Sequence, residues 1–114
     1  MIAVIFEFSA AEGRFADYKR LAEGLNEEVR KIDGFISIER FQSISNADKF
    51  VSLSFWRDEQ AVRNWRNLRK HREAQAQGRG GIFSAYRLRV CEVLRDYGNE
   101  QRGEAPKDSV AVHG

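Results

Sequence analysis

Several residue types are scarce in this chain, and each scarcity excludes a class of protein. The single cysteine, Cys91, allows no internal disulfide, which excludes a small secreted fold held by disulfides. Two histidines and one cysteine give none of the ligand spacings of a zinc site. No apolar run is long enough for a signal peptide or a membrane span. We therefore expect a cytoplasmic protein without a membrane partner.

Charge of one sign is also lacking, because the net charge is only +2. That balance gives no reason by itself to expect nucleic-acid binding. The hydrophobic share of 42% and the charged share of 32% are ordinary for a globular protein. A length of 114 residues predicts one folded domain. We place that domain at 1–97, followed by a polar tail, 98–114, that is flexible or ordered by a partner.

Residues 2–43 and 50–94 each have the pattern of a strand, a helix and a second strand. β-branched and aromatic runs predict strands over 2–8, 35–43, 50–56 and 82–94. Apolar residues three and four apart predict helices over 15–32 and from Asp58, an expected N-cap, to about Gln75. Gly34 is expected to end the first helix in a left-handed conformation.

The order βαββαβ predicts an α+β fold of the ferredoxin-like type. Its four strands would form an antiparallel sheet with both helices on one face. The predicted strands carry large apolar residues on both faces, so the face without helices would be an association surface. We expect a second copy of the chain to cover it, as a homodimer with back-to-back sheets. The alternative is that long side chains such as Arg87 and Arg89 shield this face.

The second half of the chain carries most of the residues that could support chemistry. Trp65 lies within the apolar stripe of the second helix and could form one wall of a ligand pocket. Asn64, His71 and Gln75 form a polar border beside it, and His71 could accept a proton near neutral pH. The alternative is that Trp65 is a core residue and His71 an exposed surface histidine.

Other residues could line or charge the same pocket. Tyr18 on the first helix and Tyr86 on the last strand are candidates for the lining, although aromatic residues at such positions are more often core. The second helix and its surroundings are basic, which would attract an anionic or phenolate ligand if the charges are not simply a solvated surface. Arg87 or Arg79 could hold such an anion.

Residues 1–95 resemble the antibiotic biosynthesis monooxygenase (ABM) family of the dimeric α+β barrel superfamily. The resemblance rests on the strand and helix order, on Phe55-Trp56, on Trp65, on the run from His71 to Gln75, and on Tyr86 in the last strand. It implies a homodimer with one pocket per subunit between helices and sheet. It also implies oxidation of phenols or quinols by O₂ without a metal or flavin.

The chain departs from the family at three positions. Ala61 stands where the quinone-forming members carry a substrate-contacting Asn, and His71 stands where they carry a Tyr. The haem-degrading branch requires an axial His where this chain has Gln75, which argues against haem degradation.

The resemblance therefore implies a cofactor-independent monooxygenase for a small phenolic, quinol or polycyclic aromatic molecule. Trp65 would stack on or hydrogen-bond to the substrate, and His71 would accept its proton. A non-enzymatic module that binds a small ligand or only dimerises is the alternative. RNA binding is a third hypothesis, but residues 49–56 lack the glycine and stacking aromatics of the RNA-recognition motif.

Overall fold

The structure is a computed structural model that describes residues 1–77 and 81–113, with 73–77 and 111–113 described as backbone only. Its elements are β1 (Ile2–Ala10), α1 (Phe15–Val29), β2 (Phe35–Gln42), β3 (Lys49–Trp56), α2 (Glu59–Gln77), β4 (Phe83–Glu92) and α3 (Lys107–His113). The first six follow the predicted order. The first helix ends three residues earlier than expected, and β4 is shorter at both ends.

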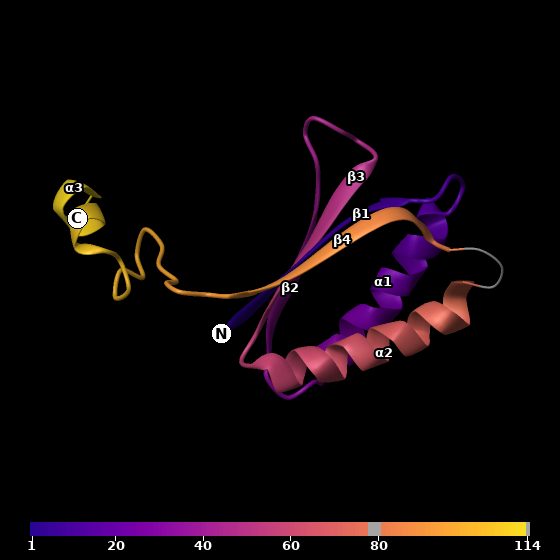
Figure 1. Cartoon of the computed structure of the whole chain (residues 1–114), viewed down its shortest axis with the longest axis horizontal. Helices are drawn as coiled ribbons and strands as arrows, with labels where there is room; N and C mark the ends of the chain where they lie inside the picture. The colour runs from indigo at the N-terminus through magenta and orange to yellow at the C-terminus, as the bar shows by residue number, and fades with distance from the viewer. Residues whose placement is uncertain (78–80, 114) are drawn as a thin grey trace.

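The four strands form one antiparallel sheet in the order β2-β3-β1-β4. Figure 1 shows α1 and α2 together on one side of this sheet. The two strand–helix–strand halves therefore interleave as predicted, and the ferredoxin-like α+β fold is confirmed. β1 and β3, the two central strands, form the floor on which both helices pack.

The core lies between this floor and the helices, in two adjoining clusters. β1 contributes alternate residues, Val4, Phe6 and Phe8, which are all buried. The register pairs Phe6 with Ser52 and Val4 with Ser54, so two small serines face the helices at the centre of the sheet. Small side chains on the floor leave room for large ones above it. That room is taken by aromatic and basic side chains from the helices.

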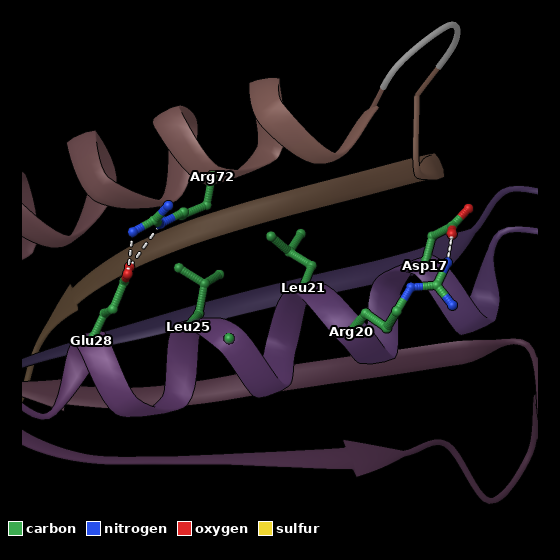
Figure 2. A pocket seen from close by; sticks show the side chains of 7 residues that line it. Asp17, Arg20, Leu21, Leu25, Glu28 and Arg72 are labelled. Carbon is green, nitrogen blue, oxygen red and sulfur yellow. Dashed lines mark hydrogen bonds and ion pairs between the residues drawn. The ribbon is translucent and has the colours of Figure 1, made fainter.

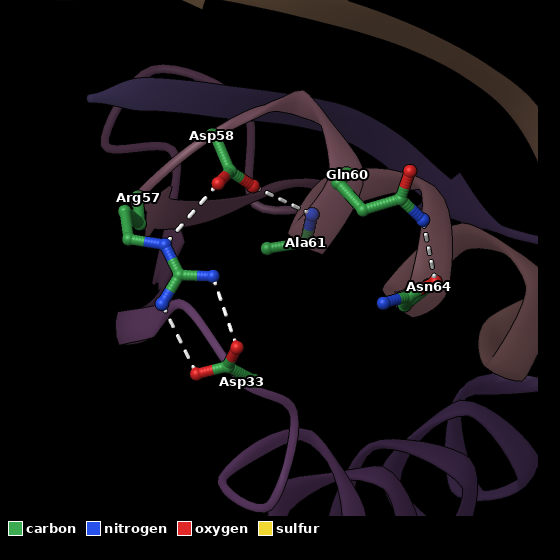
Figure 3. A network of polar contacts seen from close by, with 6 residues as sticks. All are labelled: Asp33, Arg57, Asp58, Gln60, Ala61 and Asn64. Carbon is green, nitrogen blue, oxygen red and sulfur yellow. Dashed lines mark hydrogen bonds and ion pairs between the residues drawn. The ribbon is translucent and has the colours of Figure 1, made fainter.

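Polar contacts hold the start of α2 against the turn between α1 and β2 (Figure 3). Asp58 Oδ1 accepts from the Ala61 amide at 3.0 Å, which confirms the predicted N-cap. Arg57 donates to both carboxylate oxygens of Asp33 at 3.0 Å, and these bonds hold the pKa of Asp33 below its usual value. Gly34 has φ +94°, the left-handed conformation predicted for it. These contacts join the first strand–helix–strand half of the fold to the second.

The sheet face away from the helices is apolar at its centre. The pairs Ala3 with Phe55 and Ile5 with Leu53 share this face, and all but the buried Ala3 are partly exposed. Glu7 also lies there and forms ion pairs at its rim with Lys49 at 3.7 Å and Arg89 at 3.4 Å.

After β4 the chain leaves the sheet and runs outward to α3, which lies far from the other helices (Figure 1). The radius of gyration, 16.6 Å, exceeds the roughly 13 Å of a compact domain of about 100 residues. Leu94, 78% exposed, and Val110, 45% exposed, are apolar side chains on this arm. The polar sequence of residues 98–114 gave no prediction of α3.

Candidate functional site

A small cavity lies between the helices and the sheet, at the centre of the fold. Tyr18 of α1, Trp65 and Arg69 of α2, Arg40 of β2 and Phe6 of β1 are among the residues that line it. Its volume of about 30 Å³ is close to that of a single water molecule. Four aromatic side chains, two guanidinium groups and a phenol hydroxyl therefore meet in one small, partly open cavity.

Trp65 forms the aromatic wall of this cavity and is only 4% exposed. Its ring centroid lies 5.6 Å from that of Trp56, whose indole N–H donates to Ser54 Oγ at 2.9 Å. The guanidinium carbon of Arg69 lies 4.9 Å from the centre of the Trp65 ring and 4.8 Å from that of Phe6. These distances are in the range of cation–π attraction, which holds the Arg69 charge against the cavity wall.

Arg40 and Tyr18 bring polar groups to the opposite wall. Arg40 Nη1 donates to Asn26 Oδ1 at 2.8 Å. The Nε of Arg40 and the hydroxyl of Tyr18 are buried and have no hydrogen-bond partner among the described residues. Burial raises the pKa of Tyr18, and the adjacent Arg40 guanidinium opposes this only in part, through its charge and a weak hydrogen-bonding interaction with the hydroxyl. The hydroxyl therefore stays protonated at neutral pH and can donate a hydrogen bond.

A wider groove of about 460 Å³ opens to solvent between α1 and α2 (Figure 2). Arg72 of α2 crosses it to Glu28 of α1, with Nε donating to Oε2 at 2.9 Å and Nη2 donating to Oε1. This ion pair holds the pKa of Glu28 below its usual value. Leu21 and Leu25 line both the groove and the cavity. These two leucines are therefore the partition between the open groove and the small cavity.

The structure brings together two of the residues predicted for the site, Trp65 and Tyr18. His71 is exposed on α2 and is not among the described residues that line the cavity. Asn64 is also exposed, and its Oδ1 accepts from Gln60 Nε2 at 3.1 Å (Figure 3).

The remaining predicted residues lie elsewhere or outside the description. Tyr86 is 68% exposed on the edge strand, with its ring centroid 5.8 Å from that of Phe6. Arg87 is paired in register with Glu7, so it projects from the face opposite to the helices. The side chain of Gln75 and the whole of Arg79 lie outside the described residues. The catalytic and binding roles assigned to these residues stay predictions.

Arg40 and Arg69 were missed as site residues, although the sequence holds a signal for each. Arg69 follows Trp65 by four residues, so it occupies the next position of the same helix stripe. Arg40 follows Ile38 by two, and both face the helices because their register partners are Ser52 and Ser54. In both cases the signal is a basic residue at a position that the hydrophobic pattern assigns to the core.

The comparisons with known proteins agree with this architecture. The sequence model of the family described as antibiotic biosynthesis monooxygenase matches residues 1–77. The chain belongs to this ABM family. A curated relative, the jasmonate monooxygenase ABM of Pyricularia oryzae, is 43% identical over 93 residues. That alignment covers 82% of this chain but 43% of the relative, so the chain spans less than half of that protein.

Solved ABM-like structures share the fold at low identity. A Mycobacterium tuberculosis protein superposes with a TM-score of 0.71 at 18% identity, covering 85% of this chain and 98% of that one. A mutant of SnoaB, a cofactor-independent oxygenase from Streptomyces nogalater, gives 0.67 at 9% identity, covering 83% and 94%. These likenesses confirm the fold of the ABM chain.

The described part of the ABM chain lacks both a metal-binding cluster and a membrane-spanning helix. It contains no group of three or more His, Cys, Asp or Glu side chains placed to hold a metal ion. None of its helices is long and apolar enough to cross a membrane. The described cavity lining has no histidine or cysteine, and about 30 Å³ is far too small for a porphyrin. The site in this conformation therefore does not fit haem.

Proposed function

We propose that this ABM chain is a monooxygenase that oxidises a small phenolic or quinol substrate with O₂ and needs no resident cofactor. The observation that carries the proposal is the position of Trp65 and Tyr18. In a chain of this family, they meet two guanidinium groups in one small cavity beneath the helices. The cofactor-independent oxygenase among the structural neighbours supports the same reaction class.

The proposed chemistry places the redox work on the substrate. A phenolate is electron-rich and can pass an electron to O₂, so the protein has to bind, orient and deprotonate it. The reaction balances if a CH₂ group of the substrate becomes a carbonyl. One oxygen atom enters the substrate, and the other leaves as water with the two hydrogens. All four electrons that reduce O₂ then come from the substrate, and no external reductant is needed.

Substrate entry requires the cavity to enlarge. Small-molecule sites usually measure about 300–1,000 Å³, whereas the cavity measures about 30 Å³ and the adjoining groove about 460 Å³. We infer that Leu21 and Leu25 move aside when the substrate enters, so that the groove and the cavity become one site. Exclusion of water by this closed wall would also protect the phenolate from the solvent.

Oxygen consumption tests the proposal. Protein dialysed against a chelator would be mixed in an oxygen electrode with a panel of phenols and hydroquinones, together with jasmonate because of the curated relative. Substrate-dependent O₂ uptake that scales with protein concentration supports the monooxygenase. No uptake above the protein-free rate with any compound would remove it.

Replacement of His71 by alanine separates two ways of forming the phenolate. If His71 accepts the proton, its loss would lower kcat by about 10²–10⁴-fold. Its exposed position outside the cavity lining favours the other way, in which the guanidinium charges lower the pKa of the bound phenol. We therefore expect His71→Ala to stay within about threefold of the wild-type kcat. A decrease in kcat of a hundredfold or more would instead show that His71 accepts the proton.

A non-enzymatic ligand-binding module remains the second candidate function. The cavity lining favours it in one respect, because its described residues include no carboxylate or histidine that could act as a general base. Binding of an aromatic ligand without O₂ uptake in the electrode assay would select this function.

We further propose that the apolar sheet face pairs with a second copy of the chain. Its central residues are partly exposed, and apolar side chains also lie on the arm that extends beyond the sheet. Sedimentation equilibrium at micromolar concentration is expected to give twice the chain mass. Substitution of Leu53 by glutamate, on this face, should shift the mass toward that of one chain. A wild-type mass of one chain would contradict the dimer.

A further inference from the structure

The half-buried Arg40 places a positive charge at the cavity, and the described residues offer it no negative partner. Its Nη1 bonds to the neutral amide of Asn26, and its Nε is buried without a hydrogen-bond partner among the described residues. A buried charge without a counter-ion is costly, and so is a buried donor without an acceptor. A protein retains such a group most readily where a ligand supplies what is missing.

The groups around Arg40 point to the same kind of ligand. The Tyr18 hydroxyl lies in a residue only 8% exposed and is also without a partner among the described residues. Arg69 adds a second guanidinium over the rings of the cavity wall. No carboxylate is found among the described residues that line the cavity. Hydrogen-bond donors and positive charge thus converge on one small space.

In the neighbouring groove the basic side chains have acidic partners, whereas Arg40 has none among the described residues. Arg72 is bonded to Glu28, and Arg20 to Asp17, as Figure 2 shows. The groove is therefore balanced in charge, and the cavity beneath it is cationic. An anionic ligand would gain more binding free energy at the cavity end than in the groove, since charge interactions strengthen away from water.

We infer that the cavity binds a negatively charged oxygen group, a carboxylate or phenolate, with Arg40 and Tyr18 donating to it. The group would occupy the cavity, and the aromatic body of the ligand would extend past Leu21 and Leu25 toward the groove. The assignment of this ligand as the substrate rests on the proposed function. The anion site itself does not, because it follows from the charges and donors in the cavity.

Matched ligand pairs test the inference by binding alone, under nitrogen so that no oxidation occurs. The probes are a naphthalene carboxylate with its methyl ester and naphthol with its methyl ether, measured by calorimetry. The wild-type chain is expected to bind the carboxylate at least tenfold more tightly than the ester. If the anion is a phenolate, naphthol should bind more tightly than its methyl ether. The difference in affinity should grow as the pH rises toward the pKa of naphthol. Equal affinity within both pairs would overturn the inference.

Variants locate the effect. Arg40→Gln removes the charge and keeps a polar amide on a side chain two atoms shorter. We expect it to weaken binding of the carboxylate tenfold or more and leave the ester unchanged, because bonds to charged groups are the stronger ones. Tyr18→Phe should weaken the carboxylate several-fold. Arg63→Gln is the control, because it removes one charge from an exposed position of the same basic surface on α2. An equal loss in Arg63→Gln would show a general charge effect and contradict the site.

The outcomes separate this inference from the proposed function. Anion-selective binding that depends on Arg40, with no O₂ uptake for any compound, leaves the anion site standing and removes the monooxygenase. O₂ uptake with neutral substrates that is unchanged in Arg40→Gln leaves the monooxygenase standing and contradicts the anion site. If Arg40→Gln does not fold, as judged by circular dichroism, the wild-type ligand pairs still decide.

Discussion

Replacement of Trp65 by alanine is expected to lower the free energy of unfolding by about 3–5 kcal/mol, the range for truncation of a large buried aromatic residue. Trp65 is 4% exposed and packs against Trp56 and the rings beneath α2. The free energy of unfolding of a domain of this size is only about 5–15 kcal/mol, so the expected loss is a large part of it. Urea unfolding followed by circular dichroism measures it.

Two further variants calibrate this result. Trp65→Phe keeps an aromatic ring against Trp56 and should cost clearly less than the alanine variant. Arg63→Ala lies on the exposed side of the same helix and should stay within about 0.5 kcal/mol of wild type. A loss below about 1 kcal/mol for Trp65→Ala would mean that Trp65 is not packed as described. The position of Trp65 in the wall of the cavity would then be wrong as well.

Replacement of Gly34 by alanine is expected to be the second large effect, with a loss of about 2–5 kcal/mol in the free energy of unfolding. Two causes add at this position. Its φ of +94° is one that side chains rarely adopt, and an added Cβ would lie 2.8 Å from the Cβ of Ala61 in α2. The left-handed conformation costs about 1–2 kcal/mol, and overpacking about 1–3 kcal/mol more. The turn would have to move away from α2 or lose its conformation.

Two other glycines separate these causes in the same unfolding assay. Gly13 has φ +75° with nothing within 4 Å of an added Cβ, so Gly13→Ala should show the conformational cost alone. Gly24 lies within α1 with open space around it, so Gly24→Ala should be neutral or stabilising by up to about 1 kcal/mol. If Gly34→Ala costs no more than Gly13→Ala, the close approach to Ala61 has no energetic consequence.

The fold followed from the sequence because its signals are local and repeated. Runs of β-branched and aromatic residues gave the strands, and the stripe through Leu21 and Leu25 gave α1. Asp58 marked the start of α2 because its side chain caps the helix. Gly34 has the predicted left-handed conformation, but it lies in the turn before β2 and not at the end of α1, which ends at Val29. The helix α3 was missed because seven residues with few apolar side chains carry too little periodicity.

The site was predicted only in part, because it depends on where long side chains end. His71 lies six residues after Trp65, roughly 240° around a helix of 3.6 residues per turn, so it turns away from the cavity. Arg72, one residue later, returns to the side of Trp65 and reaches Glu28. Arg40 and Arg69 have aliphatic stems that suit the core and charged ends that a hydrophobic pattern cannot place.

The central claim is that the ABM chain oxygenates an electron-rich substrate in the cavity that Trp65, Tyr18 and Arg40 line. The most direct measurement is the mass of the product formed under heavy-isotope O₂ by chelator-dialysed protein, with wild type and Arg40→Gln side by side. The account predicts one heavy oxygen atom in the wild-type product and a rate at least tenfold lower for Arg40→Gln with an anionic substrate. Product without heavy oxygen, or equal rates for the two proteins, would contradict it.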